Sequence, residues 1–288
     1  MEKYLIQDCP KKKRIEADWY VQFEPEKQKN SETGICLKET IQKAIGNLQL
    51  EENEILLASY GEGRKDRKDD YDLENRLFYN IKANETFHKI ASEELVFQKI
   101  DSVDEGRYVY EYELVTREDA VNLLRGKKLL AKWENIEIKT NLPNKPQRYY
   151  DAIRSNASQI CFQSPLPAGA PFGIKIELTV PSTCSGSHPV SVMKPLLDGV
   201  ICAFHGEDGE TKAMVSELFG EQRANELLTG SENLNLLGNR EYLKRYRNGF
   251  KWNPADEARY LRYGWIIVKI AKPGDTKEYT MSGSIYQW

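Results

Sequence analysis

The sequence has few of the residues that build disulfide frameworks and thiolate metal sites. Its five cysteines are widely spaced without any Cys-x-x-Cys pair, and it contains three histidines. An odd number of scattered cysteines argues against a disulfide framework, and zinc ribbons and fingers need paired ligands at short spacing. Cys202 and His205 could share a helix face, but Cys184 with His188 is the nearest second pair. We interpret them as ordinary thiols and histidines.

Long apolar runs and a charge excess are also missing. No segment approaches the roughly 18 apolar residues of a membrane helix, and the residues after Met1 form no apolar stretch of signal-peptide length. The 41 Lys and Arg nearly balance the 44 Asp and Glu, for a net charge of −3. No P-loop and no Gly-x-Ser-x-Gly motif occurs. These absences predict a soluble, cytoplasmic protein with no membrane partner.

The 288 residues contain alternating strand patterns and helical apolar spacing in mixed order. Strands are expected at 19–23, 54–60, 95–100, 108–115, 133–140, 172–180, 263–271 and 279–286. Helices are expected at 36–48, 72–81, 116–132, 148–156, 190–204 and 210–228. The last two strands flank a Pro-Gly turn and predict a C-terminal β-hairpin. The mixture predicts an α+β fold in which a mixed sheet packs with helices.

The best linker candidate is the proline-containing stretch at 142–146, which predicts an N-terminal half at 1–145 and a C-terminal half at 146–288. Each half has a strand, a polar loop, an apolar helix and late strands. Residues 54–81 would correspond to 172–203, and residues 108–115 to 263–271. The similar order of elements in the two halves is compatible with an internal duplication, although few residues are identical.

An acidic cluster follows the buried strand at 54–60 and opens the next helix, in the stretch Asp69-Asp70-Tyr71-Asp72-Leu73-Glu74-Asn75. Hard divalent cations prefer clustered oxygen ligands, and such a metal can activate water against a phosphodiester. Asp70, Asp72 and Glu74 are therefore the candidate catalytic residues and the candidate ligands of Mg²⁺ or Mn²⁺. The alternative is that the carboxylates cap the helix, where its dipole favours anions.

Asp72-Leu73-Glu74-Asn75-Arg76-Leu77 resembles the Asp-x-Asp-Asn stretch that opens a helix in RusA-type Holliday-junction resolvases. In that family, acidic residues of this stretch and a further acid downstream bind the metal that cuts four-way DNA junctions. Glu74 stands where the family has an Asp, and the downstream acid would be Glu93 or Glu94. The resemblance implies a RusA-like, metal-dependent nuclease.

A second part of the same family motif lies in the C-terminal half. Lys194-Pro195-Leu196-Leu197-Asp198-Gly199-Val200 is similar to the Lys-x-Leu-Leu-Asp-x-Leu portion of the resolvase helix. On this alignment, His188 and Val190 stand where the family has its two acids. The resemblance thus implies that a second site in this half would be inactive.

Cations and aromatic rings alternate in the basic aromatic segment, residues 240–252. Cations bind phosphates and flat rings stack on bases, so this pattern favours nucleic-acid contact. The candidate contact residues are Arg245, Tyr246, Arg247, Lys251 and Trp252. The alternative is an amphipathic helix that buries Leu243, Tyr246 and Phe250 and leaves its cations solvated.

Together these patterns predict a nucleic-acid-directed protein that acts on DNA or RNA, with a divalent-metal nuclease of RusA-like type as the specific hypothesis. The rival is a non-catalytic binding or protein-interaction module with a degenerate nuclease-like fold, whose partner is another protein or a second copy. The near-neutral charge tilts slightly toward the rival, because nucleic-acid binders more often carry a basic excess.

Overall fold

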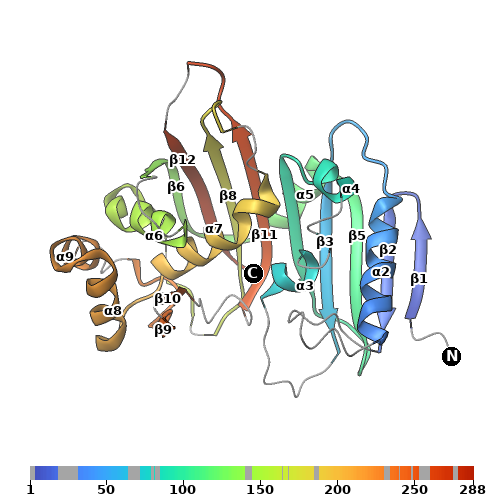
Figure 1. Cartoon of the computed structure of the whole chain (residues 1–288), viewed down its shortest axis with the longest axis horizontal. Coiled ribbons are helices and arrows are strands. Elements are labelled where there is room, and N and C mark those ends of the chain that lie inside the picture. The colour runs from blue at the N-terminus through green and yellow to red at the C-terminus, as the bar shows by residue number, and fades with distance from the viewer. Residues whose placement is uncertain are drawn as a thin grey trace. The chain divides into compact units, whose positions relative to one another are not determined.

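The computed structural model describes residues 4–18, 32–63, 72–78, 81, 85–139, 145–163, 165–167, 169–184, 188–229, 234–239, 241–247, 249–252, 260–274 and 278–288. Its contacts divide the chain into two units. Unit 1 comprises 1–126, 188–190 and 262–265, and unit 2 comprises 127–187, 191–261 and 266–288. Each unit combines strands with helices (Figure 1), which confirms the α+β prediction.

Unit 1 contains the strand order β1-β2-β5-β3-β4. The strands are β1 (Tyr4–Cys9), β2 (Lys12–Ala17), β5 (Tyr108–Thr116), β3 (Glu54–Glu62) and β4 (Glu94–Ile100). β3 and β4 run parallel, and the other pairs run antiparallel, so the sheet is mixed. The seven interior residues of β3 are all buried, which explains its continuous apolar run.

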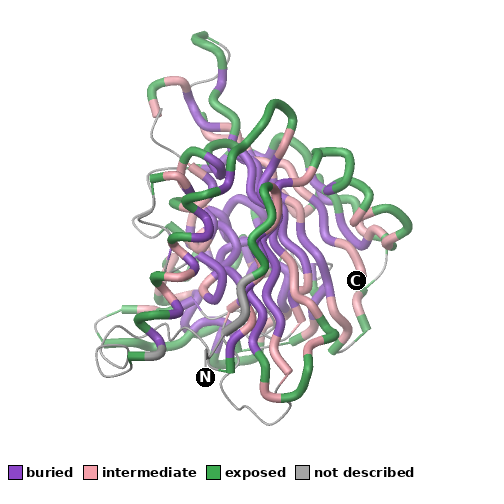
Figure 2. Tube along the Cα trace, turned by 90° about the vertical axis from the view of Figure 1, so that its right-hand side faces the viewer, coloured by how far each residue is buried: buried purple, intermediate pink, exposed green. Residues whose placement is uncertain are grey.

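The helices of unit 1 are α2 (Glu32–Gly46), α3 (Leu73–Phe78), α4 (Glu85–Ile90) and α5 (Arg117–Leu124). α2 buries Leu37, Ile41 and Ile45 at helical spacing. α5 begins with a capping box in which Thr116 and Asp119 satisfy each other's backbone N–H groups. Figure 2 shows the resulting contrast between buried strand interiors and exposed turns.

Unit 2 contains the strand order β11-β8-β12-β6-β7, in which residues 262–265 of β11 are counted with unit 1. The strands are β11 (Leu261–Ile270), β8 (Phe172–Val180), β12 (Tyr279–Gln287), β6 (Lys128–Ile138) and β7 (Cys161–Phe162). The helices are α6 (Lys145–Ser155), η1 (Ala157–Gln159), α7 (Pro189–Ala203), α8 (Gly209–Phe219) and α9 (Glu221–Thr229). A separate two-stranded hairpin joins β9 (Leu243–Tyr246) to β10 (Gly249–Trp252).

The predicted C-terminal β-hairpin is wrong, because β8 lies between β11 and β12. β8 pairs antiparallel with β12 from Phe172 to Thr179, and Ala271 N donates to Val180 O at the other edge of β8. Ile174, Ile176 and Leu178 are fully buried, as expected of the apolar residues of a central strand. The turn signal after residue 271 therefore does not join neighbouring strands.

Several boundaries differ from the sequence prediction. The first stretch of unit 1 ends at Gly126, and the following strand β6 pairs with β12 of unit 2, whereas the sequence placed the boundary at residue 145. The helix expected at 116–132 ends at Leu124, just before Gly126 at φ +79°, and the helix expected at 210–228 is divided at Gly220, at φ +81°. The strand expected at 19–23 and residues 140–144 lie outside the described residues. Within the described part of the chain, no helix is both long and apolar enough to span a membrane.

Candidate functional site

The acidic stretch lies at the start of α3 in unit 1. The backbone oxygen of Asp72 accepts the N–H groups of Asn75 and Arg76 at 3.1 and 3.2 Å, and Asp72 Oδ2 accepts a hydrogen bond from Asn75 Nδ2 at 2.9 Å. Asp72 therefore stands at the start of the helix, and its carboxylate accepts this hydrogen bond from the side chain of Asn75. Asp70 lies outside the described residues.

Glu74 occupies a different environment from Asp72. Its side chain is buried, with 2% exposure, and the neighbouring Arg76 is buried as well, with its guanidinium 5.7 Å from the centroid of the Tyr60 ring. Side chains two positions apart on a helix do not face each other. The described residues contain no cluster of three or more His, Cys, Asp and Glu side chains placed to hold a metal. Metal binding by Asp70, Asp72 and Glu74 stays a prediction.

The other residues of the resolvase-like motif also have structural partners. Glu94 is buried, pairs with Arg117 and accepts a hydrogen bond from Trp265 Nε1 at 3.2 Å, whereas Glu93 is exposed. Lys194 Nζ lies 2.7 Å from Asp198 Oδ1 one turn away on α7.

The cysteines and histidines behave as ordinary side chains. All five cysteines are free thiols, and Cys202 is buried. His205 Nδ1 lies 3.1 Å from Gly238 O.

The basic aromatic segment forms the β9–β10 hairpin and not an amphipathic helix. Its register places Leu243 opposite Trp252, Lys244 opposite Lys251, and Arg245 opposite Phe250. Opposed residues in an antiparallel pair share one face, and successive residues alternate between faces. The hairpin therefore has an inner face with Leu243 and Trp252 and an outer face with Lys244 and Lys251.

The inner face packs against the helices of unit 2. Trp252 is 5% exposed, and its ring centroid lies 5.1 Å from that of Tyr150, so this ring is covered and does not offer a surface for a base. Arg245 Nη1 lies 2.8 Å from Glu217 Oε1 on α8, and its guanidinium is 5.8 Å from the Phe250 ring centroid. The hydrogen bonds that Arg245 donates to the Glu217 carboxylate raise the pKa of Arg245.

The outer face carries cations around an exposed ring. Tyr246 is 54% exposed and follows the alternation of Lys244, so it shares a face with Lys244 and Lys251. Arg247 continues past the strand at φ +52°, with its guanidinium 5.2 Å from the Tyr246 ring centroid. Lys244 was not among the sequence candidates, and only the two-residue spacing to Tyr246 within a strand would have identified it.

A buried polar network fixes the chain where it enters β9. Tyr242 donates to Glu207 Oε1 at 3.1 Å, and the hydroxyls of Tyr150 and Tyr242 are 2.7 Å apart. Glu207 also pairs with buried Arg154. Burial raises the pKa of Tyr150 to about 12 and the pKa of Tyr242 well above its usual range. Both phenols are thus neutral hydrogen-bonding groups at physiological pH.

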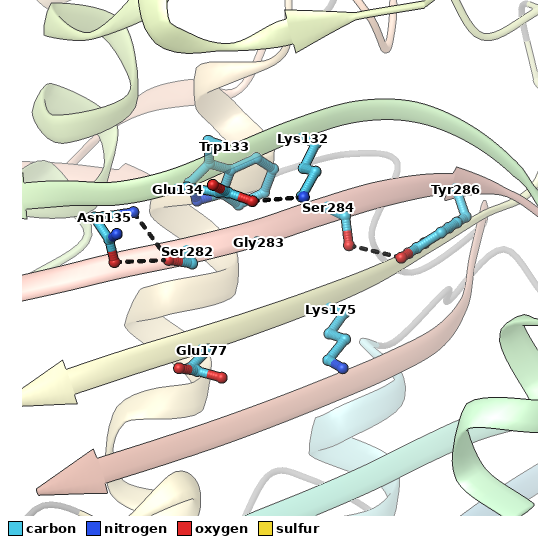
Figure 3. Close-up of a pocket in the computed structure, with 10 residues that line it drawn as sticks. All are labelled: Lys132, Trp133, Glu134, Asn135, Lys175, Glu177, Ser282, Gly283, Ser284 and Tyr286. Carbon is cyan, nitrogen blue, oxygen red and sulfur yellow. Dashed lines mark hydrogen bonds and ion pairs between the residues drawn. The ribbon is translucent and has the colours of Figure 1, made fainter. Parts of the chain in front are cut away.

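A pocket of about 290 Å³ lies on the sheet of unit 2, across β6, β12 and β8 (Figure 3). Lys132, Ser284 and Lys175 form one row across the three strands, since Ser284 is opposite both lysines. Asn135, at φ +50°, sits in a bulge of β6 and donates its N–H to Ser282 Oγ at 2.9 Å. Sequence reasoning missed this pocket entirely.

No family model, curated protein or solved structure matches this chain. The resemblance to RusA-type resolvases therefore stays a prediction from two short motifs.

Proposed function

We propose that the protein binds a single-stranded segment of DNA or RNA through the outer face of the β9–β10 hairpin. The observation that carries the proposal is the grouping of Lys244, Tyr246 and Lys251 on one exposed strand face, with Arg247 at the tip. Ammonium and guanidinium groups attract backbone phosphates, and an exposed ring offers a stacking platform.

The exposed ring is what favours a single strand over a duplex. Bases within a duplex are stacked on one another, so a protein ring stacks on bases that are already unpaired. Base–aromatic stacking contributes about 1–3 kcal/mol per base. A cation beside the ring, as Arg247 is beside Tyr246, adds an electrostatic contribution to the same contact.

The inner face explains how the hairpin presents these groups. Leu243 and Trp252 are buried, and Arg245 is held by Glu217 on α8, so the two strands are fixed with their outer side chains exposed. The protein's net charge of −3 gives little long-range attraction. Binding would therefore depend on this local group of cations, and its salt dependence would be modest.

Three cations on the hairpin predict a definite salt slope. Each phosphate neutralised on a single strand contributes about −0.7 to the slope of log K against log salt, so Lys244, Arg247 and Lys251 give about −2. The protein-interaction alternative predicts a slope near zero for its partner, because an apolar interface releases no counterions. Metal-dependent cleavage is a separate hypothesis, since binding by the hairpin needs no metal and should persist in EDTA.

Fluorescence anisotropy with labelled oligo-dT and oligo-U of about twelve nucleotides tests the proposal. Affinity should fall between about 50 and 200 mM NaCl with the expected slope. Lys244→Met/Lys251→Met should weaken binding by about tenfold and reduce the slope by about 1.4. Lys128→Met/Lys139→Met removes two exposed lysines elsewhere in unit 2 and should change neither. Equal effects of the two double variants, or no binding by the wild type, would reject the hairpin as the site.

A further inference from the structure

The sheet pocket of unit 2 brings together opposite charges from three strands (Figure 3). Lys132 on β6 and Lys175 on β8 flank Ser284 on β12, and this row is cationic. Ser282, two residues before Ser284, lies opposite Glu177 on β8 and beside Glu134 on β6, and this second row is anionic. Opposed residues share a face, so both rows line the same surface.

The two rows are separated by a fixed length of β-strand. Two residues of extended chain span about 6.8 Å, which is therefore the backbone spacing of the rows along the strands. The bulge at Asn135 keeps Glu134 on the pocket side while Trp133 and Ile136 stay buried. The hydrogen bond from Asn135 N to Ser282 Oγ fastens the anionic row across the strands.

Hydroxyl groups add directionality to the cationic row. Ser284 Oγ donates a hydrogen bond to the hydroxyl oxygen of Tyr286 at 3.0 Å. The hydroxyl proton of Tyr286 therefore points to an acceptor other than Ser284, such as a ligand. Tyr286 also lines the pocket. An anionic group between Lys132 and Lys175 would meet two ammonium groups and this phenol, which is a strong set of donors for a carboxylate.

We propose that this pocket binds a small zwitterion of dipeptide size, with its carboxylate at the Lys132–Ser284–Lys175 row and its ammonium at the row of Glu134 and Glu177. The size follows from the volume of about 290 Å³, at the lower end of ligand pockets. The termini of an extended dipeptide are about 6 Å apart, which matches the row spacing.

The ion pairs already present in the pocket are compatible with such a ligand. Lys132 Nζ lies 2.5 Å from Glu134 Oε1, and Lys269 Nζ lies 2.7 Å from Glu177 Oε1. Lys132, Glu134 and Lys269 have more than half of their side-chain surface exposed, so these pairs contribute little to stability. A ligand that presents both charges exchanges these pairs for new ones without leaving a buried charge.

Isothermal titration calorimetry with glycylglycine, glycylglycine amide and N-acetylglycylglycine tests the proposal on the full chain. Glycylglycine should bind saturably in the millimolar range, and each blocked analogue should bind about tenfold more weakly because it lacks one charge. Lys175→Met should weaken glycylglycine about tenfold but change the amide less than about twofold, since that pairing is already lost. Glu177→Gln should likewise weaken glycylglycine about tenfold but change the affinity for N-acetylglycylglycine less than about twofold, since that analogue has no ammonium group.

Lys128→Met/Glu137→Gln serves as the control, because it removes one charge of each sign from exposed positions of β6 outside the pocket. Its glycylglycine affinity should equal that of the wild type. Unchanged circular dichroism and unfolding midpoints establish that the pocket variants fold. The absence of saturable glycylglycine binding, or equal binding of the three peptides, would overturn the proposal. The hairpin variants should leave this titration unaffected, so the two sites are tested independently.

Discussion

The hydroxyl groups of Tyr150 on α6 and Tyr242 before β9 share a hydrogen bond of 2.7 Å in the interior of unit 2. Tyr242 donates its single proton to Glu207, so Tyr150 is the donor between the two phenols. The order of donation, Tyr150 to Tyr242 to Glu207, makes Tyr242 the central member of the network.

Removal of the central hydroxyl should cost more than removal of the terminal one. Tyr242→Phe deletes both hydrogen bonds and leaves the buried Tyr150 proton without its acceptor, for an expected loss of about 1–3 kcal/mol. Tyr150→Phe deletes one bond and leaves no buried donor unpaired, for about 0.5–1.5 kcal/mol. Urea unfolding of both variants measures the difference, and the reverse order would contradict the assigned donation.

Stability should fall above pH 10 because of the buried phenols. A tyrosine in the unfolded chain has a pKa near 10, whereas the pKa of Tyr150 and of Tyr149 is about 12 in the folded protein. The folded state holds these protons more tightly, so their contribution is complete below pH 10 and is lost as the pH rises through 12. Each contributes a slope of up to about 1.4 kcal/mol per pH unit in this window.

Urea unfolding at several pH values between about 9 and 12 measures this slope. Tyr150→Phe removes one titrating group and should make the decline shallower by about 1.4 kcal/mol per pH unit at most. Equal slopes in wild type and Tyr150→Phe would show that Tyr150 ionises alike in the folded and unfolded chains.

Gly283→Ala should destabilise unit 2. A Cβ atom at this position would lie 2.3 Å from Trp133 Cζ2 and 2.7 Å from the backbone oxygen of Lys175. The strand must shift or the indole must move, at an expected cost of about 1–3 kcal/mol. Thermal unfolding measures the change. Gly249→Ala is the matched strand control, since its Cβ would meet nothing within 4 Å, and its unfolding midpoint should not fall.

Arg245 and Lys251 should affect oligonucleotide binding to different degrees. Lys251→Ala removes a cation from the outer face, so we expect weaker binding and a salt slope smaller by about 0.7. Arg245→Ala removes the exposed ion pair with Glu217 and should weaken binding less. The same anisotropy assay compares them. A larger loss in Arg245→Ala would mean that Arg245 leaves Glu217 for a phosphate.

The central elements could be predicted well from the sequence because their buried positions carry apolar residues. β8 begins and ends at the predicted residues, 172 and 180, since its inward positions are apolar and alternate with polar ones. In contrast, β1 and β2 were not predicted. β2 has three cations in a row and is held by ion pairs such as Lys12 with Glu113 at 3.0 Å and Arg14 with Glu111 at 3.3 Å. These partners lie far along the chain.

The candidate sites likewise depend partly on the local sequence and partly on contacts between residues that are far apart in the chain. The basic aromatic segment was recognisable from composition, but only the hairpin register separates the buried Leu243 and Trp252 from the outward Lys244 and Lys251. The sheet pocket could not be predicted, because Lys132, Lys175 and Ser284 are brought together by strand order. No local pattern encodes which strands become neighbours.

The position of β12 between β8 and β6 has a kinetic consequence. β6 begins at residue 128, yet the strand that joins it to β8 begins at residue 279. During synthesis, the edges of β6 and β8 that pair with β12 stay unpaired until β12 has been made. The contacts between β6 and β12 then join residues that are far apart in the sequence. Unit 2 should therefore fold slowly and late, and its nascent sheet should be exposed to chaperones until that strand is inserted.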